Sequence, residues 1–267
     1  MRKFIFIVLT ITLITLVGCG KEQEENTIVV GATSIPHAEI LEEAKPILEE
    51  EGITLEIEPY EEYVLPNDDL ANETLDANFF QHIPHLEQTI EDTGYDLTHI
   101  GSIHIEPMGV YSKGIQSIDE IDNGTEVVLS NSVADHGRIL SLFEQNELIT
   151  LDDSVEPAKA TIDDIIDNPR DLVFSPDYDA AFLPEIYETE EDILVVINTN
   201  FAIEAGLKPT EDALFIEDEE SLYVNVIAVR SEDKEREELK KLVEVLHSEE
   251  ITNFILKEYD GAVVPVK

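Results

Sequence analysis

The chain has 267 residues, of which 60 are acidic and 16 are basic, so its formal net charge is −44 at pH 7. A surface this negative repels phosphate backbones, which argues against nucleic acid as a partner. Hydrophobic residues make up 43% of the chain, enough for a packed core, so disorder is not expected. We interpret the acid excess as adaptation to a salt-rich habitat, because salt screens the repulsion between surface charges.

The N-terminal segment predicts export and lipid anchoring. Two basic residues precede the apolar run 4–17, which is shorter than the roughly 20 residues of a membrane-spanning helix. Leu16-Val17-Gly18-Cys19 is typical of a bacterial lipobox, so residues 1–18 are predicted as a signal peptide and Cys19 as the lipidated first residue. Acyl chains on Cys19 would hold the protein at the extracytoplasmic face of the cell membrane, with residues 19–26 as a polar tether.

From residue 27 onward, stretches with strand periodicity alternate with amphipathic helical stretches. The predicted strands are residues 27–32, 53–57, 77–80, 96–101, 103–111, 126–129, 172–174, 193–197, 214–216 and 222–229. The predicted helices are residues 34–51, 84–91, 117–122, 135–146, 161–167, 201–205, 234–247 and 249–258. Alternating units of this kind predict open α/β sheets covered by helices. We expect two lobes, with residues 27–108 and 203–267 in lobe 1 and residues 109–202 in lobe 2.

Residues 63–86 carry the most informative pattern of the chain. Phe79 and Phe80 are adjacent, and His82 and His85 flank Pro84. Aromatic rings supply apolar area, while Asn, Gln and His supply a few directed hydrogen bonds, and this mixture is typical of a small-molecule pocket wall. The alternative is a core strand that runs into a helix begun by the proline.

This stretch resembles the ligand-binding signature of the MetQ/NlpA family, the methionine-binding lipoproteins of ABC importers. The chain reads Tyr-Val-Leu-Pro-Asn from Tyr63 and Asp-Ala-Asn-Phe-Phe-Gln-His-Ile-Pro-His-Leu from Asp76. The similarity continues in the same order through residues 107–112, 137–138, 168–170, 197–199 and 223–225. The resemblance implies an α/β, two-lobe periplasmic-binding-protein-like fold (a type II solute-binding protein), with the ligand in the inter-lobe cleft.

An α-amino acid is a zwitterion, so its burial requires a cationic or N–H partner for the carboxylate and acceptors for the ammonium group. Arg138, one of only five arginines, is the candidate for the carboxylate. We expect it in the first turn of a helix, where a cation opposes the helix dipole unless an anion docks there. Its guanidinium would then grip the carboxylate in two parallel hydrogen bonds. The alternative is an ion pair with Asp135 or another nearby acid.

Two asparagines are further candidates. Asn198 follows the predicted buried strand 193–197 at its carboxyl end, where ligands of open α/β sheets collect. Asn225 lies in an apolar stretch, where an unpaired amide would be costly. Either amide is alternatively explained by a turn cap or by hydrogen bonds to neighbouring backbone.

The resemblance assigns roles to these residues. It implies that an arginine of the Gly-Arg motif takes the ligand carboxylate and that two asparagines grip the amino-acid backbone groups. The polar clamp is then Arg138, Asn198 and Asn225. The side-chain pocket is implied to be lined by Tyr63, Phe80, His82 and His85. A thioether is polarizable and packs well against aromatic rings, which suits methionine.

The chain departs from the family pattern at two places. His85 stands where the family usually has tyrosine, and Ala134 and Asp135 stand where the family's run before Gly-Arg has Thr and Asn. A related amino acid or a short methionine-containing peptide therefore stays possible as the ligand. Because a charged imidazole would repel an ammonium group, we expect affinity to fall below about pH 6 through His85.

The resemblance implies a lipid-anchored receptor that delivers its ligand to an ABC permease powered by a separate ATPase, with no cofactor of its own. One alternative is a surface lipoprotein that binds Zn or Mn, since His82, His85, His99 and His104 supply metal-ligand types. Another is a non-transport adhesin. An enzyme is not expected, because the chain has no Gly-x-Ser-x-Gly elbow and no Gly-rich phosphate loop. Asp135 and His136 near Ser132 are adjacent in sequence, which does not arrange them as a triad.

Overall fold

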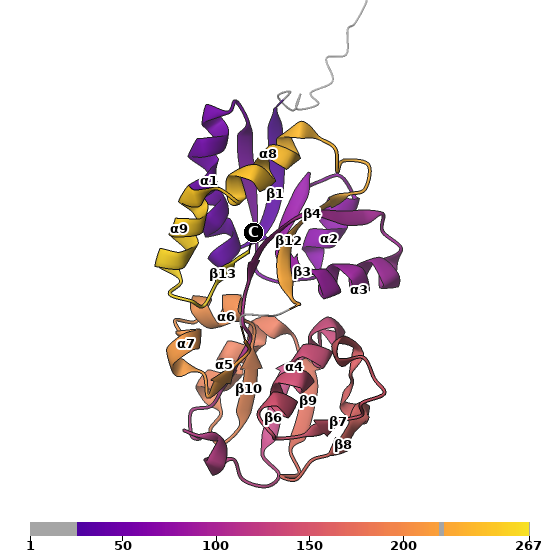
Figure 1. Cartoon of the computed structure of the whole chain (residues 1–267), viewed down its shortest axis with the longest axis vertical. Coiled ribbons are helices and arrows are strands. Elements are labelled where there is room, and N and C mark those ends of the chain that lie inside the picture. Colours follow the sequence, from indigo (N-terminus) through magenta and orange to yellow (C-terminus); the bar gives the residue numbers. More distant parts are fainter. Residues whose placement is uncertain (1–25, 219–221, 267) are drawn as a thin grey trace, which may run out of the picture.

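The structure is a computed structural model that describes residues 26–218 and 222–266. The chain forms two lobes, each an open sheet with helices on its faces, and the fold is the two-lobe α/β architecture predicted (Figure 1). The predicted signal peptide, Cys19 and all of the tether except Asn26 lie outside the described residues. No helix in the described ranges has both the length and the apolar character needed to cross a membrane.

Lobe 1 is built on a six-stranded sheet with the order β13-β4-β12-β3-β1-β2. β1 runs parallel to β2 and β3, whereas β12 is antiparallel to β3 and β4. The strands are β1 (Thr27–Thr33), β2 (Thr54–Tyr60), β3 (Ala77–His82), β4 (Leu97–Ile105), β12 (Val224–Arg230) and β13 (Val264–Pro265). β3 is buried along its whole length, so both of its faces are covered.

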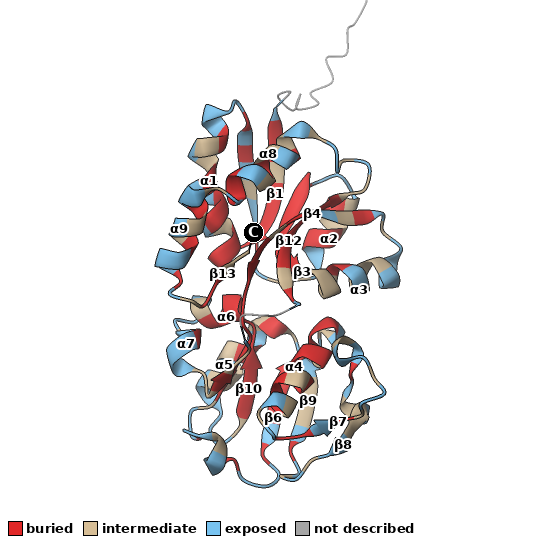
Figure 2. Cartoon of the chain, viewed as in Figure 1, coloured by how far each residue is buried: buried red, intermediate tan, exposed pale blue. Residues whose placement is uncertain are grey.

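Helices cover both faces of this first sheet because each carries one apolar stripe. In α1 (Glu39–Glu50) the buried residues recur at helical spacing, as Ile40, Leu41, Ala44 and Leu48. They pack with α8 (Glu237–Leu246) and α9 (Glu249–Glu258) on one face. The other face is covered by α2 (Leu65–Ala71) and α3 (Ile83–Thr93). Figure 2 shows the outcome, with buried strands inside and exposed outer helix faces.

Lobe 2 is built on a five-stranded sheet with the order β11-β5-β10-β6-β9. Its strands are β5 (Gly109–Tyr111), β6 (Glu126–Ser130), β9 (Val173–Tyr178), β10 (Leu194–Ile197) and β11 (Phe215–Ile216). A separate two-stranded ribbon pairs β7 (Thr150–Leu151) with β8 (Ile165–Asp167). One apolar cluster joins α4 (Val133–Gln145) to the sheet. The other face packs against α5 (Leu183–Thr189) and α6 (Thr199–Glu204), followed by α7 (Pro209–Asp212).

The chain passes between the lobes twice. The first passage, residues 106–108, joins β4 to β5, and the second joins β11 to β12. The sequence predicted that the chain re-enters lobe 1 at residue 203. In the structure it does so later, because β11 still pairs with β5 in the sheet of lobe 2. β11 has only two residues, too few for a hydrophobic periodicity that would show which sheet it joins.

Several predicted elements differ in the structure. The predicted helix 161–167 is wrong, because only Ile162–Asp164 forms a helical turn and the next three residues pair as β8. The helix predicted from Ser34 begins regularly at Glu39, since Ile35 is extended. The predicted strand 172–174 forms part of β9, an edge strand of the second sheet, in which Val173 is 52% exposed. α5, β7 and β13 were not predicted.

The break predicted between residues 101 and 103 is also wrong, because β4 runs through it. Gly101 lies inside β4, and a Cβ on it would come within 2.5 Å of the Val243 side chain. This glycine therefore permits close packing of α8 on the strand and does not end the strand.

Candidate functional site

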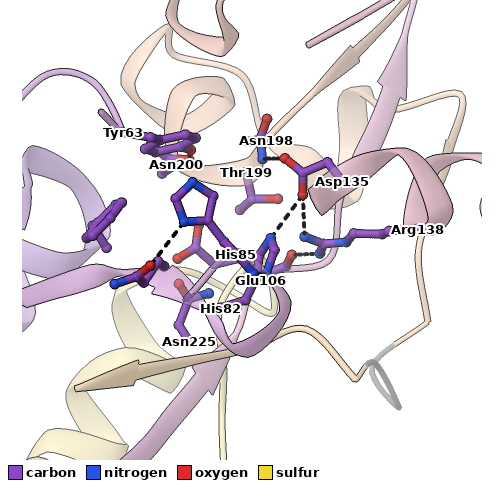
Figure 3. A pocket seen from close by; sticks show the side chains of 12 residues that line it. Tyr63, His82, His85, Glu106, Asp135, Arg138, Asn198, Thr199, Asn200 and Asn225 are labelled. Atoms are coloured by element: carbon purple, nitrogen blue, oxygen red, sulfur yellow. Dashed lines mark hydrogen bonds and ion pairs between the residues drawn. The ribbon is translucent and has the colours of Figure 1, made fainter. Parts of the chain in front are cut away.

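One pocket between the lobes gathers all seven residues that the sequence singled out, as Figure 3 shows. The space between these residues, counted together with the open solvent at its mouth, is about 380 Å³. Side chains from β3 and α3 of lobe 1 face side chains from α4 and α6 of lobe 2. Five more residues complete the lining: Gln81, Glu106, Asp135, Thr199 and Asn200. The position fits the expectation that ligands of such folds lie between the lobes.

Aromatic rings form one end of the pocket. The Tyr63 ring lies 6.0 Å from that of Phe80 and 5.1 Å from that of Phe201, between ring centroids. The Tyr63 hydroxyl also donates across the cleft to Asn200 Oδ1 at 2.5 Å. Because side chains alternate along β3, Phe79 points the other way and is buried in the lobe 1 core. Only one of the two adjacent phenylalanines therefore lines the pocket.

A network of amides orients His85 beside these rings. Gln81 and Asn67 exchange hydrogen bonds of 2.9 and 2.7 Å, and Gln81 Oε1 also accepts from His85 Nδ1 at 3.0 Å. Burial, followed by the neighbouring His82, lowers the pKa of His85 to about 4. The imidazole is therefore neutral at physiological pH, and its Nε2 is an acceptor.

This pKa corrects the expected loss of affinity below pH 6. Because His85 gains its proton only near pH 4, ligand affinity should change by less than about twofold between pH 5 and 8. It should fall as the pH approaches 4, where the imidazolium would repel an ammonium group. Titration calorimetry across this range, with His85→Gln as the non-titrating control, measures the effect. A tenfold loss in the wild type between pH 7 and 5.5, absent from the control, would contradict this placement of the pKa.

Asp135 links the two lobes at the polar end of the pocket. Its Oδ1 accepts from His82 Nε2 at 3.0 Å, and its Oδ2 accepts from Asn198 Nδ2 at 3.3 Å. The His85 backbone N–H donates to His82 Nδ1, so the proton of the His82 ring lies on Nε2. Burial alone would raise the pKa of Asp135, but the bond from His82 and the charge of Arg138 hold it well below its usual range. Asp135 is therefore a fixed buried anion.

Arg138 also lies at the polar end, 5% exposed, but it differs from the expectation in two respects. α4 begins at Val133, so Arg138 is in the second turn of the helix and not in the first. Its main partner is Glu217, whose Oε2 accepts from Nε at 2.8 Å and from Nη2 at 2.6 Å, while Asp135 is 4.0 Å from Nη1. Nη2 also donates to the Glu106 carbonyl at 2.5 Å. In the described residues, the N–H groups of Nη1 have no hydrogen-bond partner.

The glycine before Arg138 explains why the helix lies where it does. A Cβ on Gly137 would come within 2.4 Å of the Pro157 carbonyl oxygen and 2.6 Å of the Ala158 carbonyl carbon, both backbone atoms. The bare helix face lets residues 157–159 pack directly against α4. In the Gly-Arg pair, Gly137 therefore allows close packing against residues 157–159, and Arg138 lines the pocket.

We therefore expect Gly137→Ala to destabilise the protein by about 1–3 kcal/mol through overpacking. Helix propensity alone predicts the opposite sign, a gain of about 1 kcal/mol. The free energy of unfolding in urea decides between them. Equal or greater stability of the alanine variant would show that the contact with residues 157–159 relaxes without cost.

Behind the pocket, two buried histidines converge on Glu106. His37 Nε2 lies 3.1 Å and His104 Nε2 2.7 Å from Glu106 Oε1. The possible ligand atoms of His37, His104 and Glu106 lie within 4.8 Å of one another. Among the described His, Cys, Asp and Glu side chains, this trio is the group that could hold a metal ion. The metal alternative based on residues 82, 85, 99 and 104 is not assembled, because His99 is exposed on β4 and His82 bonds Asp135.

The residues considered for a triad also separate. Asp135 bonds His82 and Asn198, while His136 Nε2 bonds the Ser130 carbonyl at 3.0 Å. No relay from Asp135 through His136 to Ser132 exists among these bonds.

Comparisons with known proteins show which family the chain resembles. A family model described as NlpA lipoprotein matches residues 28–267. The methionine-binding lipoprotein MetQ of Bacillus subtilis is 45% identical over 253 residues, covering 92% of this chain and 90% of that protein. The D-methionine-binding lipoprotein MetQ of Escherichia coli K12 is 36% identical over 253 residues, covering 94% and 93%.

Solved structures of other proteins resemble the chain in both fold and sequence. A putative methionine-binding lipoprotein from Bacillus subtilis has a TM-score of 0.89 at 44% identity, covering 91% of this chain and 98% of that one. A nutrient binding protein from Burkholderia cenocepacia, solved bound to methionine, has a TM-score of 0.85 at 35% identity, covering 90% and 100%.

Proposed function

Because this chain belongs to the NlpA lipoprotein family, we propose that it is the solute-binding component of an ABC importer and that it binds methionine between its lobes. The observation that carries the proposal is the pocket itself. It has an aromatic end and a polar end, and all seven residues of the predicted ligand set line it. A methionine would place its thioether against Tyr63 and Phe80, where sulfur–ring contacts contribute about 0.3–1.5 kcal/mol.

The polar end supports an amino-acid ligand. Arg138 has two N–H groups on Nη1 that make no hydrogen bond to a described residue, with Asp135 4.0 Å away, and these would donate to the ligand carboxylate. Because Nε and Nη2 of the guanidinium already donate to Glu217, the hydrogen bonds to the ligand carboxylate would come from Nη1 alone. Asn198 and Asn225 also line the pocket and would be amide partners for the backbone groups of the ligand.

The anchor and the permease complete the proposal. Relatives named above are lipoproteins, and Cys19 would be the lipidated residue that holds this chain at the extracytoplasmic face of the cell membrane. From there it would deliver methionine to a permease driven by a separate ATPase. Loss of acyl labelling and release from membranes in Cys19→Ala would support the anchor, and unchanged membrane retention would overturn it.

Titration calorimetry on the chain without its signal peptide tests the ligand. L-methionine, D-methionine, methionine dipeptides and zinc chloride are titrated separately. We expect one site per chain with micromolar or tighter affinity for a methionine enantiomer. Heat from zinc alone, or from none of the four, would refute the proposal.

A further inference from the structure

The buried carboxylate of Glu106 has no assigned partner in the function proposed above. It lies in the first passage between the lobes, lines the pocket and is only 6% exposed. Its Oε1 accepts from His104 Nε2 at 2.7 Å, and His37 Nε2 lies 3.1 Å from the same oxygen. Within residues 26–218 and 222–266, no hydrogen bond engages its Oε2.

Two histidines each present a ring N–H to Glu106 through Nε2. The buried Nδ1 of His104 has no partner in the described part of the chain, and a lone pair there costs less than an unpaired N–H, so the proton lies on Nε2. His37 Nε2 faces two acceptors, Glu106 Oε1 and Asn225 Oδ1, so it carries a proton, and its Nδ1 lies 2.7 Å from the Thr33 hydroxyl. Burial lowers the pKa of His104, which agrees with a neutral ring.

Glu106 is a buried anion that its neighbours stabilise. Burial alone would raise its pKa, but the two imidazoles hold the pKa well below its usual range. The second anion of the pocket, Asp135, differs because both of its oxygens are engaged. A free carboxylate oxygen beside a neutral amide is the acceptor pair that an ammonium group needs.

We propose that Glu106 Oε2, together with Asn225 Oδ1, binds the α-ammonium group of the ligand. This inference rests on the proposed function and adds to it a requirement for a free amino group. The ligand would lie with its ammonium toward the first passage between the lobes and its carboxylate toward Arg138 Nη1. His37 and His104 position the carboxylate and keep it ionised.

A two-by-two comparison tests the proposal. Methionine and 4-(methylsulfanyl)butanoate, which lacks the amino group, are titrated into the wild type and into Glu106→Gln. In the variant the amide oxygen can serve the two histidines, and the amide nitrogen replaces the free oxygen. We expect methionine to bind about 100-fold more weakly to the variant, and the desamino compound to bind both proteins equally.

Controls keep each outcome decisive. Glu39→Gln removes a negative charge from lobe 1 outside the pocket lining and should bind both ligands as the wild type does. If Glu106→Gln does not fold, Glu106→Asp is the second variant, because it moves the carboxylate back by one methylene and keeps its charge. It should weaken the binding of methionine but not that of the desamino compound.

Equal losses for both ligands would overturn the ammonium role and leave methionine binding intact. Failure of the wild type to bind methionine would overturn the proposed function and this inference with it. Stoichiometric zinc binding that competes with methionine and disappears in Glu106→Gln would assign the trio to a metal ion instead.

Discussion

Arg138→Ala should weaken methionine binding by about 2–5 kcal/mol, the largest effect expected of any single pocket substitution. The guanidinium is 5% exposed, so the ligand carboxylate that meets it has left water. With alanine in its place, that carboxylate keeps its desolvation cost and loses its cation. The neighbouring anions Glu217 and Asp135 would then repel it as well.

The measurement needs a control for folding, because Arg138 also holds Glu217 and the Glu106 carbonyl. Circular dichroism should show an intact fold with a lower melting temperature, and calorimetry should be run well below that temperature. Arg170→Ala is the matched control, since Arg170 caps the Ile121 carbonyl in lobe 2 and does not line the pocket. Arg138→Lys should recover only part of the affinity, because an ammonium lacks the planar guanidinium donors. Wild-type affinity in Arg138→Ala would remove Arg138 from the site.

Molar NaCl should raise the melting temperature by about 5–10 °C relative to dilute buffer, because the surface carries a large excess of like charge. The outer face of α1 illustrates the cause. Glu42, Glu43, Glu49 and Glu50 are exposed there, and the only cation on this helix, Lys45, is 4.0 Å from Glu42. At molar salt the Debye length falls to about 3 Å, which removes most of the repulsion between such neighbours.

Differential scanning calorimetry in NaCl and in KCl measures this effect. Screening depends on ionic strength, so the two salts should act alike. A melting temperature that does not rise with salt would refute the link between composition and a salt-rich habitat. A rise with only one salt would point to a specific ion site in place of screening.

The sequence predicted those parts of the molecule in which the information is local. β1, β3, β10, α4 and α9 were found because their apolar residues recur at strand or helix spacing. The seven pocket residues were found through motifs, and the structure brings them around one cavity. Their roles in ligand binding stay predictions that the experiments above test.

What the sequence did not show depends on contacts between distant segments. Glu217 is 79 residues from Arg138 and meets it only because β11 joins the second sheet. Glu106 is an isolated acid before a proline, and its position between His37 and His104 depends on both the π-type turn after β1 and the end of β4. The low pKa of His85 likewise follows from burial, which residue type alone does not fix. Thr199 and Asn200 directly follow Asn198, and that adjacency was the one available signal for them.

A crystal structure of the chain with methionine tests the central claim most directly. We predict closed lobes with the methionine carboxylate within hydrogen-bond distance of Arg138 Nη1, the ammonium group at Glu106 Oε2, and the thioether against Tyr63 and Phe80. A cleft that stays empty at saturating methionine, or a methionine bound with Arg138 contacting only Glu217 and the Glu106 carbonyl, would contradict it.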